Sequence, residues 1–265
     1  SFVIYDNAGN STTKSITVWN IEEVAPTGTL TQTPTGDTNG NVTLNLTSIA
    51  DTGGSGYYRT QLPTGAYVTT TTASHVVTTN GSYSFVIYDN AGNSITKTIS
   101  VTNIDKTSPT GTLTQTPTTW TNGNVTLNLT SIADVDSGVK NIKLPNGTLV
   151  TGTSASQVVS VNGSYSFVIY DNAGNSTTKT IVVGNIDEIA PTGTLTQTPT
   201  SWTNGNVTLN LTSIADNDSG VKNIKLPNGT LVTGTTASQS VSVNGTYSFV
   251  IYDNAGNSTT KSITV

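Results

Sequence analysis

The six-residue phrase Tyr-Asp-Asn-Ala-Gly-Asn occurs four times in this 265-residue chain. Its copies begin at Tyr5, Tyr88, Tyr170 and Tyr252, so the successive spacings are 83, 82 and 82 residues. A unit of this length is too long for one element of a helical solenoid and is close to the size of a small β-sandwich. The spacing therefore predicts a tandem array in which each repeat folds around a core of its own.

Other anchor phrases keep the same period and set the frame of the array. Gly-Thr-Leu-Thr-Gln-Thr-Pro begins at Gly28, Gly111 and Gly193, whereas the first residues of the chain match only the end of a unit. We therefore predict a remnant of a preceding repeat, consisting of its last two strands, and three repeats. The predicted ranges are 1–20 for the remnant and 21–103, 104–185 and 186–265 for the repeats. This frame indicates a segment of a longer protein.

Composition narrows the classes of partner. Charged residues make up only 9% of the chain and the net charge is -5, so no basic patch is available for nucleic acid. No cysteine is present, which excludes a disulfide framework and thiolate metal sites. No apolar run approaches the roughly 20 residues that span a bilayer, so we expect no membrane insertion.

Alternating hydrophobic residues predict the fold class. In the second repeat, Val125, Leu127 and Leu129 alternate with polar residues, which is the period of a half-buried strand. We expect Val159 and Val161 to form a later strand of the same repeat. About seven short strands with frequent turn signals and no helical period predict an all-β sandwich without disulfides.

The sixth expected strand carries a family resemblance. The stretch Asn162-Gly-Ser-Tyr-Ser-Phe167 resembles the immunoglobulin pattern in which a tyrosine, two residues before a cysteine, bonds back across a corner. With the Asp171-Asn-Ala-Gly-Asn turn, the Leu144-Pro-Asn-Gly-Thr hairpin and the linker 185–191, the unit resembles the bacterial Ig-like repeats of cell-surface proteins and adhesins. The resemblance covers essentially the whole chain and implies tandem Ig-like sandwiches in an extracellular, cell-surface or secreted protein.

Ig-like topology brings three acidic segments to one pole of each repeat. The entering linker, the loop after the second strand and the loop after the sixth strand are expected to meet at the junction with the preceding repeat. The acidic residues expected there are Asp105, Asp134, Asp136 and Asp171 at one junction, and Asp187, Glu188, Asp216, Asp218 and Asp253 at the next.

Two interpretations of these acidic residues remain open. Clustered carboxylates repel one another unless they are neutralised, and Ca²⁺ accepts about six to eight oxygen ligands, so calcium at the inter-repeat junctions is one interpretation. The other is that the aspartates form tight turns by bonding to their own backbone. Neither interpretation makes a cofactor a requirement of the fold.

Catalytic chemistry has little support in the sequence. His75 is the only histidine, and no cysteine nucleophile is present. A serine or threonine nucleophile needs a base held against it, and no histidine recurs with the period to provide one. We therefore predict that the chain is not an enzyme.

Three function classes follow. The near-identity of residues 109–183 with 191–265 favours a structural spacer or stalk that projects a functional head or packs laterally into a surface layer or filament. The alternative is an adhesive module that binds a glycan or a partner protein through the divergent first repeat. Its candidate residues are Tyr57, Tyr58, Arg59 and Tyr67. An enzyme accessory domain that binds polysaccharide is the third class. The expected partners are the neighbouring repeats, with lateral self-association and a glycan or surface protein as further candidates.

Overall fold

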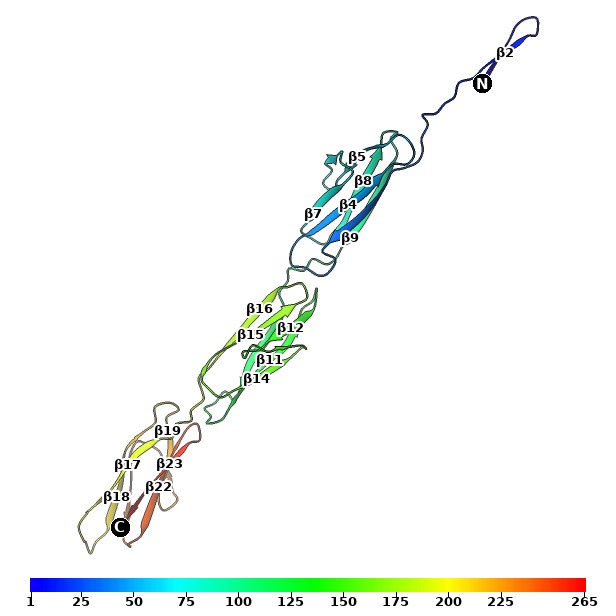
Figure 1. Ribbon diagram of the computed structural model, residues 1–265. Helices are drawn as coiled ribbons and strands as arrows, with labels where there is room; N and C mark the ends of the chain where they lie inside the picture. Colours follow the sequence, from blue (N-terminus) through cyan, green and yellow to red (C-terminus); the bar gives the residue numbers. More distant parts are fainter. The chain divides into compact units, whose positions relative to one another are not determined.

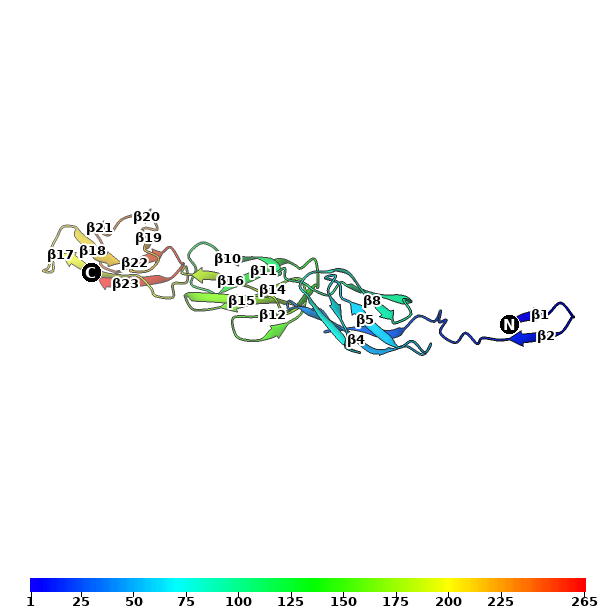
Figure 2. The same cartoon turned by 90° about the horizontal axis from the view of Figure 1, so that it is seen from above.

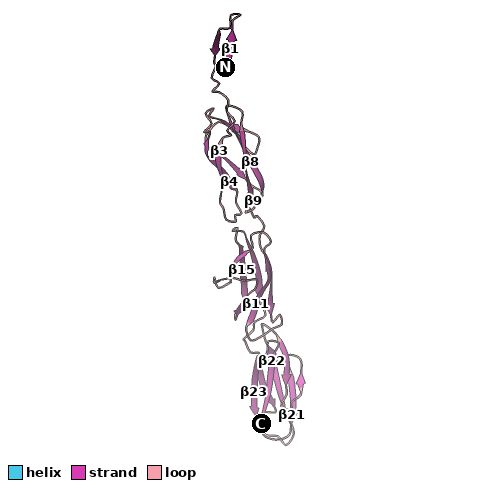
Figure 3. Cartoon of the chain, turned by 90° about the vertical axis from the view of Figure 1, so that its right-hand side faces the viewer, coloured by secondary structure: helices cyan, strands magenta, loops and turns pink.

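The structure is a computed structural model that describes residues 1–265. It contains only strands, turns and loops, so no helix is present that has the length and apolar character needed to cross a membrane (Figure 3). The chain divides into two compact units. One comprises residues 1–107 and 172–175, and the other comprises residues 108–171 and 176–265.

The first unit contains a hairpin and the first repeat. The hairpin pairs β1 (Phe2–Tyr5) with β2 (Ser11–Lys14), and the side chains of both strands are exposed. In the first repeat, one sheet has the order β3-β4-β7 and the other has the order β6-β5-β8-β9 (Figure 1). The bounds are β3 Thr27–Thr33, β4 Val42–Ala50, β5 Tyr57–Gln61, β6 Tyr67–Val68, β7 Ala73–Val77, β8 Gly81–Asp89 and β9 Ser94–Val101.

The second unit contains the same arrangement twice (Figures 1 and 2). The second repeat has sheets β10-β11-β14 and β13-β12-β15-β16, and the third has β17-β18-β21 and β20-β19-β22-β23. The second repeat comprises β10 Thr110–Thr116, β11 Val125–Ala133, β12 Val139–Lys143, β13 Leu149–Val150, β14 Ala155–Val159, β15 Gly163–Asp171 and β16 Ser176–Val183. The third comprises β17 Thr192–Thr198, β18 Val207–Ala215, β19 Val221–Lys225, β20 Leu231–Val232, β21 Ala237–Val241, β22 Thr246–Asp253 and β23 Ser258–Thr264.

Each repeat is a sandwich whose core lies between its two sheets. In the second repeat, Leu127 and Leu129 of β11 face Phe167 and Ile169 of β15, and all four side chains are fully buried. The residues between them along each strand are partly or fully exposed, as a period of two requires. The predicted fold class, all-β tandem Ig-like sandwiches without disulfides, is confirmed.

A β-bulge keeps the second strand of each repeat facing the core. The inward positions of β11 change phase after Leu129, so that the next buried side chain is Ile132. Between them, Ser131 has a φ of 52°, in the left-handed region that residues other than glycine rarely adopt. The extra residue turns Ile132 back toward the core, and Ser48 and Ser213 repeat this conformation in the other two repeats.

The expected tyrosine corner is present in every repeat. The Tyr165 hydroxyl donates a hydrogen bond to the Val161 carbonyl at 2.6 Å, and Tyr83 and Tyr247 make the equivalent bond. This corner also corrects the expected strand at Val159 and Val161, because β14 ends at Val159 and the Val161 side chain is exposed. The chain turns there and presents the Val161 carbonyl to the tyrosine.

The linkers pack against the preceding repeat. Ile186 is 6% exposed, lies in the core cluster of the second repeat and forms a parallel bridge with Thr121. Ile104 has the equivalent position in the first repeat, where it bridges to Thr38. The predicted boundaries at 103/104 and 185/186 therefore separate an isoleucine from the core to which it belongs. The other domain boundaries stay predictions.

The first strand of each sandwich approaches the core so closely that it requires glycine. A Cβ added to Gly111 would lie 2.8 Å from Cδ1 of Ile169, a fully buried side chain. We expect Gly111→Ala to lower the free energy of unfolding by about 1–3 kcal/mol because overpacking forces neighbouring side chains to move. Urea denaturation measures the change. Gly184→Ala is the matched control, since its Cβ would meet no atom within 4 Å, and equal effects of both changes would contradict the prediction.

Candidate metal centre

Three carboxylates from separate segments meet at the start of the third repeat. Asp187 lies in the linker after β16, Asp216 follows β18, and Asp253 ends β22. One oxygen of each carboxylate lies within 4.8 Å of the others. Asp187 is 2% exposed and Asp253 is fully buried, while Asp216 is partly buried. We call these three residues the third-repeat triad.

Tight turns position two of the triad carboxylates. Asp253 Oδ1 accepts hydrogen bonds from the backbone N–H groups of Gly256 and Asn257, both at 2.7 Å. Asp216 Oδ1 accepts one from the Gly220 N–H at 2.6 Å. These are the bonds that the turn-forming interpretation predicts. They hold each side chain in a defined orientation toward the other two.

Asp187 connects the linker to a loop of the third repeat. Its Oδ2 accepts a hydrogen bond from the Ser219 N–H at 3.1 Å, and its Oδ1 accepts one from the Ile189 N–H at 2.9 Å. Burial raises the pKa of Asp187, but the hydrogen bonds from Ser219 and Ile189 outweigh burial and hold the pKa below its usual value. Asp187 is therefore ionised at neutral pH. No cationic side chain contributes to this balance.

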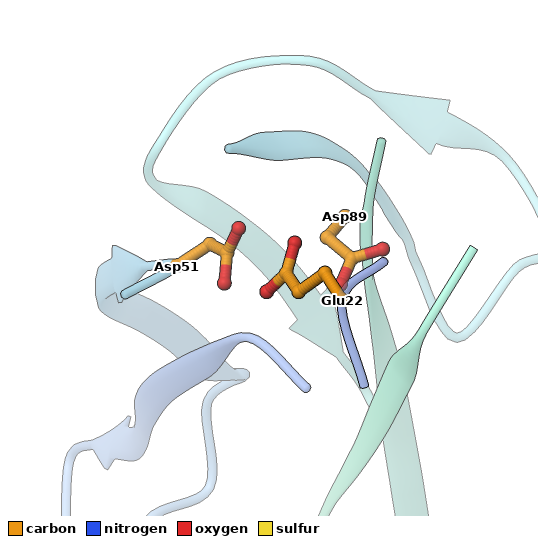
Figure 4. A group of neighbouring side chains, drawn as sticks. All are labelled: Glu22, Asp51 and Asp89. Atoms are coloured by element: carbon orange, nitrogen blue, oxygen red, sulfur yellow. The ribbon is translucent and has the colours of Figure 1, made fainter. Parts of the chain in front are cut away.

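An equivalent set occurs at the start of the first repeat. One oxygen each from Glu22, Asp51 and Asp89 lies within 4.8 Å of the others, and we call these residues the first-repeat triad. Figure 4 shows the Glu22 carboxyl group between those of Asp51 and Asp89. Burial raises the pKa of Asp89, but hydrogen bonds from Asn93 and its neighbours hold it below the usual value. Two buried or partly buried carboxylates thus surround a third.

Glu22 provides a direct test of whether a cation fits. Its Oε2 accepts a hydrogen bond from the Ser55 N–H at 2.9 Å, whereas its Oε1 is buried and has no hydrogen-bond partner. A Cβ added to Gly53 would overlap this Oε1, so glycine leaves the space that the carboxylate occupies. A buried carboxylate oxygen without a donor is a costly arrangement that a bound cation relieves. The all-oxygen donor set fits a hard cation such as Ca²⁺.

The remaining predicted ligands have different environments. Asp105 belongs to the first unit and Asp134 and Asp171 to the second, so their expected set stays a prediction. Individually, Asp105 and Asp171 are buried, and Asp134 accepts a hydrogen bond from the Gly138 N–H at 2.8 Å. Asp136, Glu188 and Asp218 have exposed side chains, and Glu188 and Asp218 lie outside the third-repeat triad. Glu188 follows Asp187 directly in the linker, but its side chain is exposed whereas that of Asp187 is buried.

The first-repeat triad is not among the metal ligands that the sequence predicts. Its members stand one period before the predicted ligands: Glu22 precedes Asp105 by 83 residues, and Asp51 precedes Asp134 by 83. Extending the period backwards identifies them. The first repeat differs from the other two in two respects. Glutamate replaces aspartate in its linker, and the loop after Asp51 has one more residue before Gly56.

The predicted binding residues of the first repeat divide between two faces. Tyr57 is partly buried and packs against the core, and its hydroxyl donates to the carbonyls of Val68 at 3.2 Å and Thr70 at 3.0 Å. Tyr57 thus lies on the core side of β5, and its role in surface binding stays a prediction. Tyr58 and Tyr67 are exposed and Arg59 is partly buried.

Residues 204–265 match the model of a family described as bacterial Ig-like domain. Residues 122–183 of the second repeat are almost identical to this segment. The third repeat is therefore identified as a bacterial Ig-like domain, and the second repeat shares nearly all of its sequence. None of the curated proteins compared with the chain matches it.

Solved structures of other proteins are similar to this chain. A structure of a 1.5-MDa bacterial ice-binding adhesin is 19% identical, with a TM-score of 0.40, over 84% of this chain and 89% of that chain. A tetra-tandem repeat from the extending region of a large adhesion protein is 19% identical, with a TM-score of 0.27, over 99% and 79%. Dimeric latent PorU from Porphyromonas gingivalis is 12% identical, with a TM-score of 0.23, over 91% and 34%.

Charge repulsion within the third-repeat triad predicts an unusual effect of Asp216→Asn. Two charges within 4.8 Å of each other repel by roughly 3 kcal/mol or more at an effective dielectric constant of about 20. Asparagine retains the oxygen that accepts the Gly220 bond but removes the charge. In buffer with chelator, we expect the free energy of unfolding to rise by about 1 kcal/mol, measured by urea denaturation. Exposed Asp218→Asn is the control, expected to change it by less than about 0.5 kcal/mol. Destabilisation by Asp216→Asn in chelator would contradict this account.

Proposed function

We propose that this chain is a non-catalytic spacer segment of a bacterial surface protein, in which Ca²⁺ bound by the carboxylate triads stiffens the joints. One observation carries the proposal: two consecutive residues of one linker are held by different repeats. Ile186 is buried in the core of the second repeat, and Asp187 belongs to the triad of the third. The joint between these repeats thus has no slack chain that would let them move independently.

Backbone hydrogen bonds support this role for the linker. The Thr121 N–H donates to the Asn185 carbonyl at 3.0 Å, and the Asp187 N–H donates to the Thr121 carbonyl at 2.9 Å. On the other side, the Asn257 amide donates to the Asp187 carbonyl at 2.8 Å. The Asn122 N–H also bonds directly to the Ala255 carbonyl at 3.1 Å. The second and third repeats therefore hold the linker from both sides and contact each other.

Ca²⁺ would supply the positive charge that the triads lack. Asp187, Asp216 and Asp253 would hold the ion in the third repeat, and Glu22 and Asp51 would hold it with Asp89 in the first. Within each triad, one ligand comes from the incoming linker and two come from loops of the repeat that follows. Binding would therefore couple the linker to that repeat. Calcium sites of extracellular modules have dissociation constants of about 10⁻⁴–10⁻³ M, which suits a protein outside the cell.

The pattern of sequence variation favours a spacer. The second and third repeats are almost identical, and the features they share are core positions, turns, corners and linker residues. A spacer needs these features in every copy and needs no unique site. The partners of each repeat are then its neighbours in the same chain.

Calcium titration of the whole 265-residue chain tests the proposal. We expect Ca²⁺ to raise the melting temperature, equivalent to about 2.7 kcal/mol at a hundredfold excess over the dissociation constant. X-ray scattering is expected to show a less flexible chain with Ca²⁺ than with chelator. Asp187→Asn should reduce both effects, because it removes a ligand contributed by the linker. Glu188→Gln is the matched control, because Glu188 is next to Asp187 in the chain but is exposed and does not belong to the triad.

The mechanical part of the proposal has a separate test. Ile186→Ala should increase flexibility at the joint both with and without Ca²⁺, because it removes the linker from the core of the second repeat. Scattering curves that are identical with and without chelator would remove calcium from the account. If Ile186→Ala were no more flexible than the unmodified chain, the proposal that the linker forms a stiff joint would be wrong.

A further inference from the structure

An arginine surrounded by tyrosines lies on one sheet of the first repeat. The guanidinium carbon of Arg59 lies 5.0 Å from the ring centre of Tyr58, 4.1 Å from that of Tyr67 and 5.4 Å from that of Tyr88. The rings of Tyr67 and Tyr88 are 6.4 Å apart and inclined by 54°. We call these four residues the arginine–tyrosine platform.

The register of the sheet explains how the platform forms. Arg59 of β5 is paired directly with Tyr88 of β8, and Tyr67 of β6 is paired with Gln61, two residues further along β5. Side chains two residues apart share a face, so these residues all lie opposite the core. A bulge between Tyr57 and Arg59 interrupts the pairing and places Tyr58 on the outer face as well.

The guanidinium group lacks partners for its N–H groups. The Arg59 side chain makes no hydrogen bond or ion pair with another residue, and its Nε atom is buried without a partner. Stacking on aromatic faces stabilises the positive charge, but it does not satisfy the N–H donors, which lie in the plane of the group. Arg59 is also the only arginine in a chain with a net charge of -5. The platform therefore holds a positively charged group in place while its N–H donors lack an acceptor in the protein.

The platform is specific to the first repeat. At the positions of Tyr58, Arg59 and Tyr67, the second repeat has Lys140, Asn141 and Leu149, and the third has Lys222, Asn223 and Leu231. Only the fourth tyrosine is common to all three repeats. The sandwich thus folds without the platform, and the spacer role does not require it.

We propose that the platform binds a polysaccharide that carries uronic acid residues. The guanidinium fork matches a carboxylate in a planar, two-bonded geometry that lysine cannot reproduce. Tyr58 and Tyr67 are 49% and 48% exposed, so their rings are available to pack against the apolar faces of sugar rings on either side of that carboxylate. One cation among several rings and hydroxyl groups suits a ligand that offers sugar-ring faces and hydroxyls beside its carboxylate, which an acidic peptide does not.

The test uses the whole chain and oligogalacturonates as the probe, in buffer with chelator so that bridging by divalent cations is excluded. Methyl-esterified oligogalacturonates are the matched ligand, since they keep the sugar and lose the charge. We expect isothermal titration calorimetry to show the acid binding at least roughly tenfold more tightly than the ester. Arg59→Asn and Tyr67→Leu, which introduce the kind of residue found in the other repeats, should weaken binding by about tenfold and threefold respectively. Arg59→Lys should retain only part of the affinity.

A transplant gives an independent test in the same molecule. Lys140→Tyr, Asn141→Arg and Leu149→Tyr together rebuild the platform beside Tyr170 in the second repeat, and we expect the number of bound oligosaccharides per chain to double. Circular dichroism and melting temperature establish that each variant is folded. Equal affinity for acid and ester, unchanged binding by folded Arg59→Asn, or tighter binding of poly-glutamate than of the oligogalacturonate would each overturn the proposal.

Discussion

Phe167 and Ile169 of one sheet pack against Leu127 and Leu129 of the other, and the positions of the loops follow from this contact. Full burial of side chains of this size contributes about 1.5–3 kcal/mol each. A domain of about 80 residues has a small core, and these repeats contain no cysteine that would cross-link it. The turn at the end of β15 and the loop after β11 therefore reach the same end of the sandwich only because the inward side chains interlock.

The two interpretations of the acidic residues apply to the same atoms. In the third repeat, Asp253 Oδ1 closes a turn by accepting backbone N–H groups, and an oxygen of the same carboxylate lies near those of Asp187 and Asp216. The turn therefore positions the proposed ligand rather than replacing it. Hydrogen bonds from Ser219 and Ile189 hold the pKa of Asp187 below its usual value, and those from Asn93 and its neighbours do the same for Asp89, so the charge that attracts a cation is retained. Turn formation alone does not account for Glu22, whose Oε1 is buried without a partner.

Strands and corners were predictable from the sequence because both depend on local patterns. The period of two identifies the inward face of β11 and β15, and the tyrosine corner depends on residues only four apart. Features that depend on irregular backbone were not predictable. A bulge in β5 separates Tyr57 from Tyr58 and Arg59 and sends Tyr57 toward the core. Glu22 and Asp51 keep the period of the array, but the sequence does not show that the Glu22 carboxylate reaches between those of Asp51 and Asp89.

The position of Ile186 has a consequence for biosynthesis. Because this residue completes the core of the second repeat although it follows the last strand, that core stays open until the linker has been made. In a chain that is synthesised from its N-terminus, the second sandwich is complete only when the linker residue after its last strand has emerged. Adjacent copies that are almost identical in sequence are prone to exchange strands while both are unfolded. If folding follows this order, one repeat is folded before the strands of the next repeat are available for exchange.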